Sequence, residues 1–216
     1  RCLEQRHEVL MGEAEAEGKY IRQSGGRGQY GHVWLSVKPL ERGKGFEFVN
    51  AIKGGVIPQE FISPIEKGVK EALSRGVVAG YPVMDVEVKI FDGSYHEVDS
   101  SEAAFRMAGS MALQEAVKNA KPVILEPIMK VQIIVPMDYL GEVTGNVNSK
   151  RGRIESINDR GTNKIIDAKI PLSEMFGYVT ELRSMTQGRG SSTMEFDHYD
   201  PVPKNIEAEI VSGKRK

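Results

Sequence analysis

The sequence predicts an α+β protein of two domains. Its 216 residues allow one large domain or two small ones at about 100–200 residues each. Alternating apolar segments, typical of strands, are interspersed with segments in which apolar residues recur at helical spacing. After the segment Lys121–Pro127, these elements follow the order βαββαβ, which is the ferredoxin-like split arrangement. We therefore expect the domain boundary within that segment.

The first domain is predicted to span residues 18–124. Residues 1–17 are charged and poorly patterned, which predicts a lead-in segment and not a packed element. Strands are expected at Lys19–Gln23, Val33–Val37, Phe46–Val49 and Tyr81–Ile90. The last of these should present one apolar face, formed by Met84, Val86, Val88 and Ile90.

Two helices are predicted in the first domain. Ser63, Pro64 and Glu66 carry the pattern of a helix start with a capping box, and Gly76 is placed to end that helix. Its expected apolar face consists of Ile65, Val69 and Leu73. Asp99 and Glu102 form a second possible capping box. The inner stripe expected for the helix that follows consists of Ala104, Ala108, Met111 and Ala112.

The second domain is predicted to span residues 125–203. Strands are expected at 128–135, 153–158, 164–170 and 192–196, and helices at about 138–149 and 173–186. The inward residues expected on these helices are Leu140, Val143, Val147, Phe176, Val179 and Leu182. Residues 204–216 form a tail that is expected either to dock as a short helix or to fray.

Composition excludes several classes of protein. The net charge of −1 is incompatible with a globally basic nucleic-acid binder, so any such contact must come from local clusters of Lys and Arg. A single cysteine excludes a disulfide framework and a cysteine-based zinc site, and it fits the cytoplasm. No apolar run approaches the ~20 residues that span a bilayer, so we expect no membrane partner. Acidic residues interrupt the N-terminus and argue against a signal peptide.

A glycine-rich stretch, Ser24–His32, carries the most distinctive chemistry. Gly26 to Val33 match G-x-G-x-x-G-x-V, a pattern that cradles phosphates in some nucleotide-binding proteins. A dinucleotide site must open a helix, whereas this stretch runs into an alternating, β-branched strand. Ala51-Ile52-Lys53 resembles the kinase lysine strand, but the kinase catalytic and metal-binding motifs are absent from the sequence. A glycine-loop phosphotransferase therefore remains only an alternative.

Five separated blocks resemble, in order, the C-terminal half of bacterial elongation factor G. The blocks are Gln23–Val33, Lys53–Pro58, Gly93–Glu102, Glu126–Met129 and Pro171–Tyr178. The resemblance implies the fourth and fifth domains of that factor, within a fragment or truncated form. The fourth domain would have the ribosomal protein S5 domain 2-like fold, with a left-handed βαβ unit, and the fifth would be the ferredoxin-like domain.

The resemblance also implies a function. In the family, the tip of the fourth domain contacts the tRNA–mRNA duplex in the decoding centre of the ribosome during GTP-dependent translocation. Other translational GTPases of the ribosome-protection type carry similar halves and are an alternative, although the loop sequence favours the translocase. The tip residues that the resemblance implies are Gly25, Gly26, Arg27, Gly28, Gln29, Tyr30, Gly31, His32, Ser94, Tyr95 and His96.

The chemistry of this tip suits RNA. Backbone N–H groups freed by glycine, with Arg27 and Gln29, can reach phosphates and 2′-hydroxyls, and His96 adds a donor or a stacking surface. A second candidate surface, for ribosomal RNA, consists of Lys150, Arg151 and Arg153, whose charges could instead complement a helix C-terminus. The expected partners are the ribosome, its RNA, the tRNA–mRNA duplex and the remaining domains of the factor.

No catalytic residue or metal site is expected. The GTPase domain of the factor is missing from the sequence, so we expect a non-enzyme without cofactor, GTP and Mg²⁺ belonging to the rest of the factor. Asp92, His96 and Asp99 could suggest a metal, but Asp99 is accounted for by helix capping and no second histidine is near. His198, between Asp197 and Asp200, is interpreted in the same way.

Overall fold

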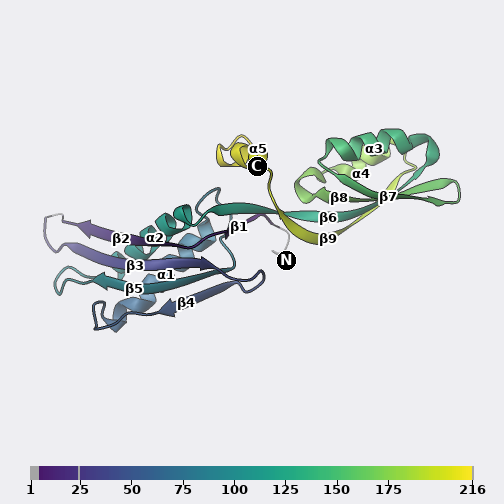
Figure 1. Ribbon diagram of the computed structural model, residues 1–216. Coiled ribbons are helices and arrows are strands. Elements are labelled where there is room, and N and C mark those ends of the chain that lie inside the picture. The colour runs from purple at the N-terminus through teal and green to yellow at the C-terminus, as the bar shows by residue number, and fades with distance from the viewer. Residues whose placement is uncertain (1–4, 24, 216) are drawn as a thin grey trace. The chain divides into compact units, whose positions relative to one another are not determined.

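A computed structural model describes residues 5–23 and 25–215 of the chain. It divides into two compact units (Figure 1). The first unit contains residues 6–124 together with the residues from 202 onward, and the second contains residues 125–201. Both units combine a sheet with helices, which confirms the predicted α+β class. None of the helices in the described ranges is long and apolar enough to span a membrane.

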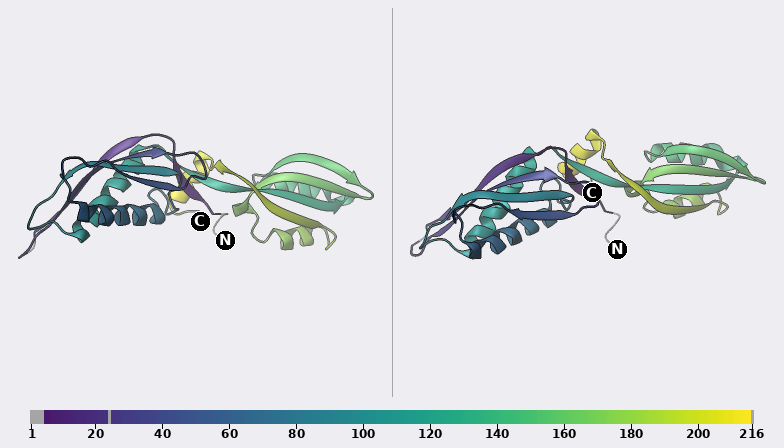
Figure 2. Two further views of the ribbon diagram at one scale, coloured as in Figure 1. Left: turned by 90° about the horizontal axis from the view of Figure 1, so that it is seen from below. Right: turned by 60° about the horizontal axis from the view of Figure 1, so that its bottom comes forward.

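The first unit is built on a four-stranded sheet. The strand order is β2 (Ala14–Arg22), β3 (Gln29–Pro39), β5 (Val86–Ser94) and β4 (Phe46–Asn50). The β2–β3 and β3–β5 pairs are antiparallel, and β4–β5 is parallel. Figure 2 shows helices α1 (Ile62–Arg75) and α2 (Glu102–Asn119) on one face of this sheet. Alternate apolar residues of β3 and β5 are fully buried beneath them, as the period of two predicted.

The predicted lead-in segment was wrong for residues 7–10 and 14–17. These residues form β1 (His7–Leu10), which is buried throughout, and the first part of β2. Burial of Glu8 is tolerated because its carboxylate accepts hydrogen bonds from three successive backbone N–H groups, those of Val77, Val78 and Ala79, at 2.9–3.1 Å. In β2 the glutamates occupy the solvent face, and Ala16 faces the core. Residues 1–4 lie outside the described ranges.

The helix starts differ from the predicted ones. Helix α1 begins at Ile62 after a 3₁₀ turn, Gln59–Phe61, and has no side-chain cap, so Ser63 and Pro64 lie inside its first turn. Gly76 follows its last residue with φ 75°, as predicted. Helix α2 is capped by Ser101, whose hydroxyl accepts from the N–H of Ala104, and not by Asp99.

Two methionines predicted to face the core are exposed. Met84 is 43% exposed, because it precedes β5 and is outside its alternation. Met111 is 41% exposed, because the alanines that lie against the sheet define a narrower stripe than the one predicted. The residues of this stripe are Ala104, Ala108 and Ala112, all fully buried.

The second unit has the predicted ferredoxin-like arrangement. Its elements are β6 (Pro122–Pro136, which begins in the first unit), α3 (Leu140–Ser149), β7 (Arg153–Arg160), β8 (Asn163–Pro171), α4 (Tyr178–Met185) and β9 (Ser191–Pro201). The sheet order is β9-β6-β8-β7, with every pair antiparallel. Val143, Val147 and Leu182 of the helices pack on buried apolar residues of β6 and β8.

The inner face predicted for the last helix of this unit was partly wrong. Phe176 is 80% exposed and Val179 is 53% exposed, whereas Tyr178 and Leu182 are buried. Gly177 has a left-handed backbone, with φ 74°, between a 3₁₀ turn (Leu172–Glu174) and α4. The helical spacing therefore cannot be counted through this glycine.

The C-terminal residues return to the first unit. Helix α5 (Lys204–Val211) buries Ile206 and Ile210 against Ile124 and Val202. The N–H of Val202 also donates to the carbonyl oxygen of Ile124 at 2.9 Å. Of the two outcomes expected for the tail, the structure shows docking as a short helix.

Candidate nucleic-acid interface

Two loops meet at one end of the sheet in the first unit. The glycine loop, residues 23–28, joins β2 to β3, and the histidine loop, residues 95–100, follows β5 (Figure 1). In the antiparallel register His32 lies opposite Ser94, so the start of β3 and the end of β5 are at the same end of the sheet. Residues separated by 62 positions are thereby neighbours. Ser24 falls outside the described residues.

Hydrogen bonds join the two loops directly. The N–H of Gly28 donates to Asp99 Oδ1 at 3.1 Å. Arg27 Nε donates to the carbonyl oxygen of Val98 at 2.9 Å, and the N–H of Tyr30 donates to the carbonyl oxygen of Asp99 at 2.9 Å. The two loops therefore form one surface, which we call the tip.

Three of the predicted tip residues hold the tip together from inside. Ser94 Oγ lies 2.7 Å from both Tyr30 Oη and His32 Nδ1. The other ring nitrogen of His32, Nε2, is 2.6 Å from Glu17 Oε1. Because their polar side-chain atoms are engaged within the fold, Tyr30, His32 and Ser94 are placed to position the tip.

Gly31 also has an internal role. A Cβ at this position would lie 2.4 Å from the carbonyl oxygen of Ala104, so only glycine lets α2 approach β3 this closely. Gly25 and Gly26 differ, because their φ values are 47° and 154° and no atom lies within 4 Å of a Cβ built on either. Packing does not require glycine at these two positions, whereas their backbone conformation favours it.

Among the predicted tip residues, the exposed side chains are those of Arg27, Gln29, Tyr95 and His96, and Glu97 and Val98 of the histidine loop are exposed beside them. The His96 side chain is 55% exposed, and its ring lies 6.1 Å from the Tyr30 ring, centroid to centroid. Its backbone N–H donates to Ser100 Oγ at 2.8 Å, which fixes the turn that presents it. The exposed groups at this end of the sheet thus include a guanidinium, an amide, a phenol, an imidazole, a carboxylate and two open glycines.

Sequence reasoning missed the part played by Asp99. It assigned the carboxylate to the start of α2, but the structure places it between the two loops, where Oδ1 accepts from Gly28 and Oδ2 is 3.6 Å from His96 Nδ1. An aspartate three residues before a glutamate fits either role, so the sequence pattern contained no signal that separates them.

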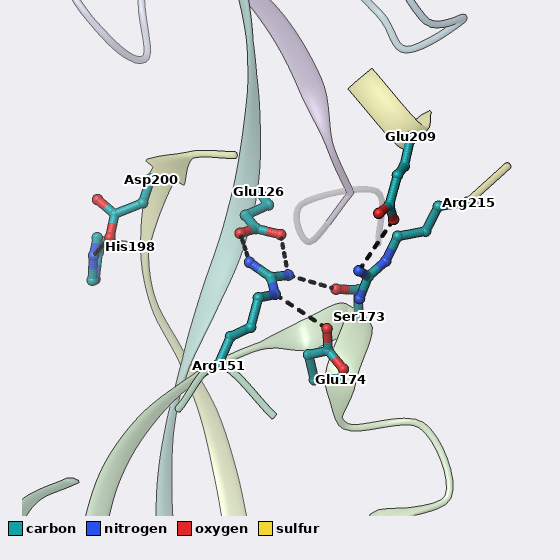
Figure 3. A network of polar contacts seen from close by, with 8 residues as sticks. All are labelled: Glu126, Arg151, Ser173, Glu174, His198, Asp200, Glu209 and Arg215. Atoms are coloured by element: carbon teal, nitrogen blue, oxygen red, sulfur yellow. Dashed lines mark hydrogen bonds and ion pairs between the residues drawn. The ribbon is translucent and has the colours of Figure 1, made fainter. Parts of the chain in front are cut away.

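The three cations predicted to form a second surface make different contacts and so have different roles. Arg151 has a left-handed backbone, with φ 55°, and makes a bidentate pair with Glu126, at 2.7 and 3.0 Å. Arg151 Nε also donates to Glu174 Oε1 at 3.1 Å (Figure 3). Hydrogen bonding to Glu126 raises the pKa of the Arg151 guanidinium above its ordinary value. Since Glu126 is only 2% exposed, Arg151 serves mainly to neutralise a buried carboxylate.

Lys150 also forms an ion pair within the protein, whereas the Arg153 side chain is largely exposed to solvent. Lys150 Nζ is 2.8 Å from Glu181 Oε2 and lies over the Tyr178 ring. This ion pair holds the pKa of Glu181 below its usual range. The side chain of Arg153 is 76% exposed, with one contact to Glu155 at 3.3 Å. Among the three, Arg153 is therefore the side chain best placed to meet a partner.

The candidate metal ligands are engaged in contacts within the protein. His198 contacts both Asp197 and Asp200, and these carboxylates raise its pKa above the ordinary value. Within the described ranges, no group of three or more His, Cys, Asp or Glu side chains is arranged to hold a metal ion.

Comparison with known proteins defines the class. Residues 5–121 match the family model described as "Elongation factor G, domain IV", and residues 123–210 match that described as "Elongation factor G C-terminus". The two units are thus domains of a translation elongation factor, with ribosomal protein S5 domain 2-like and ferredoxin-like folds. The chain belongs to the elongation factor G family.

A solved structure supports this assignment. The crystal structure of ttk003000868 from Thermus thermophilus is similar, with a TM-score of 0.76 and 40% sequence identity. The match covers 97% of this chain and 31% of that chain, so this chain spans about a third of the length of its relative. The two matched domains are non-catalytic parts of the factor.

Proposed function

We propose that this chain is a ribosome-binding part of a translocase of the elongation factor G family. In this proposal the tip contacts the tRNA–mRNA duplex in the decoding centre during GTP-dependent translocation. The observation that carries it is the hydrogen-bonded union of the glycine and histidine loops into one exposed surface. A single continuous surface suits a partner that is recognised by its shape.

The exposed groups match the chemistry of an RNA minor groove. Open glycine N–H groups donate to phosphate or 2′-hydroxyl oxygens, and neither contact depends on base sequence. Arg27 is held through Nε, and its two terminal nitrogens have no hydrogen-bond partner among the described residues, so they can donate to an RNA partner. Contact that is independent of sequence is what a factor serving every codon requires.

The second unit is proposed to meet ribosomal RNA through Arg153, with Lys150 beside it. Arg151, which the sequence included in this surface, is assigned to the fold instead because of its buried partner. GTP hydrolysis and its Mg²⁺ are assigned to other domains of the factor, which are further partners, and the site of action is the cytoplasm.

The phosphotransferase alternative fits the geometry poorly. The glycine loop lies within a β-hairpin, and the N–H of Gly28, the second glycine of the pattern, already donates to the Asp99 carboxylate and so does not serve a nucleotide phosphate. Lys53, the candidate kinase-like lysine, follows β4 and is not part of a strand. We expect ATP with Mg²⁺ to leave the melting temperature unchanged, because only a ligand of the folded state raises it. The family match also favours the translocase over ribosome-protection proteins.

The proposal is tested by ribosome binding. The purified chain is titrated with ribosomes that carry tRNA and mRNA, and with vacant ribosomes. We expect Arg27→Ala and His96→Ala to weaken binding to the loaded ribosomes about tenfold, or about 1.4 kcal/mol, with little change on vacant ones. Lys44→Ala, at the opposite end of the sheet, is the matched control. Equal affinity of all variants for loaded ribosomes would refute the proposed contact.

A further inference from the structure

A third loop lies at the same end of the sheet as the tip. Residues Lys53, Gly54 and Gly55, here called the lysine loop, follow β4, which runs parallel to β5 with Asn50 opposite Ile90. Strand β5 continues from there to Ser94. A Cβ on Gly93 would lie 2.6 Å from Cδ1 of Ile57, just beyond the lysine loop. In Figure 1 the turn after β4 lies at the same end as the β2–β3 loop.

The backbone of the lysine loop is open. Gly54 and Gly55 have φ values of 66° and 69°, and no atom lies within 4 Å of a Cβ built on either. Among the described residues, none accepts a hydrogen bond from the N–H groups of Lys53, Gly54 or Gly55. Lys53 is exposed and has no ion pair with any of those residues. The loop thus shares two features with Gly25-Gly26-Arg27, an open left-handed backbone and an adjacent cation.

A turn elsewhere in the first unit shares both features but not the free backbone donors. Residues 41–45 also combine glycines of positive φ with cations. In that turn the N–H groups of Gly43 and Gly45 donate to Asp85 Oδ1 at 3.1 and 2.9 Å. The turn lies at the opposite end of the sheet, where β4 starts beside Val86. Its donors are used within the protein, whereas those of the lysine loop are free to meet a partner.

We propose that the lysine loop is a third RNA contact, which binds a backbone phosphate through Lys53 Nζ and the N–H groups of Gly54 and Gly55. Phosphate oxygens accept readily from successive backbone N–H groups and from ammonium groups. This inference rests on the proposed function, since it extends the RNA footprint of the tip to the neighbouring strand β4. It assigns a role to the sequence block Lys53–Pro58 that packing of the glycines does not explain.

The test is the salt dependence of binding to ribosomes that carry tRNA and mRNA. Each phosphate contact contributes about 0.7–0.9 to the slope of log affinity against log salt concentration. We expect Lys53→Ala to lower the slope by about that amount, Lys53→Arg to preserve it, and Lys44→Ala to leave it unchanged. Melting temperatures verify that each variant is folded, which is expected because Lys53 has no ion pair within the described part of the chain.

The outcomes separate the two proposals. If Arg27→Ala lowers the slope but Lys53→Ala does not, the lysine loop is not an RNA contact and the proposed function stands. If the unaltered chain does not distinguish loaded from vacant ribosomes, the proposed function fails and this inference fails with it. A photo-crosslinker on Lys53→Cys, in a Cys2→Ser background, should react with RNA. Reaction with ribosomal protein alone would overturn the inference.

Discussion

The N–H of Gly28 donates to the Asp99 carboxylate at 3.1 Å, across 71 positions of the sequence. A Cβ on Gly28 would lie 3.0 Å from Asp99 Cγ, so any side chain at position 28 would crowd the carboxylate. It joins the end of one hairpin loop to the loop that carries His96. The arrangement of the proposed RNA-binding surface therefore depends on this pair.

Asp99→Ala is expected to loosen the tip. Loss of a hydrogen bond to a charged, partly buried acceptor should lower the free energy of unfolding by about 1–2 kcal/mol, measured in urea. The same variant should bind loaded ribosomes more weakly, because the two loops are no longer held together. Asp99→Asn keeps an oxygen acceptor and should behave more like the unaltered chain. Unchanged ribosome affinity in Asp99→Ala would show that the clamp does not matter for binding.

The glycines of the tip should fall into two groups. Gly31→Ala places a methyl group against the backbone of α2, and we expect the free energy of unfolding to fall by about 3 kcal/mol or more. Gly25→Ala meets no atom and should cost only about 1 kcal/mol for its left-handed backbone. Urea unfolding of both variants measures the difference. Similar losses for the two would contradict the division into packing and contact glycines.

Alanine substitutions at Arg151 and Arg153 should have different effects on the free energy of unfolding. Arg151→Ala leaves the buried Glu126 carboxylate without its partner, and we expect a loss of about 3 kcal/mol in unfolding free energy. Arg153→Ala should leave stability nearly unchanged and lower the salt slope of ribosome binding. If Arg151→Ala is as stable as Arg153→Ala, the assignment of Arg151 to the fold is wrong.

His198 should make stability depend on pH. Its neighbours Asp197 and Asp200 raise its folded-state pKa above 6.5, so the stabilisation is complete below that pH and is lost as pH rises through the folded pKa. The pKa of Asp197 is lowered, chiefly by Lys169, so this carboxylate stays ionised throughout that window and its own stabilisation is lost only in acid. Urea unfolding between pH 6 and 9 should show that the free energy of unfolding of the unaltered chain falls as pH rises. The fall should be smaller in His198→Gln. Parallel pH profiles would contradict this expectation.

Much of the fold follows from the pattern of residues. The βαββαβ order, the alternation in β3 and β5 and the alanine stripe of α2 all follow from period and length. The predictions were wrong where the apolar pattern of a segment was weak or was interrupted. The alternation of β2 was missed because its core-facing residues, Ala16 and Gly18, give only a weak apolar signal. Gly177 interrupted the helical spacing that had placed Phe176 inside.

The location of the site could be predicted from the sequence better than the contacts that its residues make. Glycine content and chain order indicated both loops, but the sequence could not separate Gly31, which packs on α2, from Gly25, which faces solvent. Nor could it distinguish Asp99 as a clamp from Asp99 as a helix cap, or Arg151 as a buried partner from a surface cation. These distinctions depend on contacts between residues that are distant in sequence.

The most direct test of the account is cleavage of RNA by hydroxyl radicals from a tethered iron probe. In a Cys2→Ser background, Glu97→Cys places the probe on the histidine loop, and Lys44→Cys places it at the far end of the same sheet. With ribosomes that carry tRNA and mRNA, we predict that the probe at 97 cleaves the tRNA anticodon region and the mRNA, and that the probe at 44 does not. Cleavage of these RNAs from 44 and not from 97 would contradict the account.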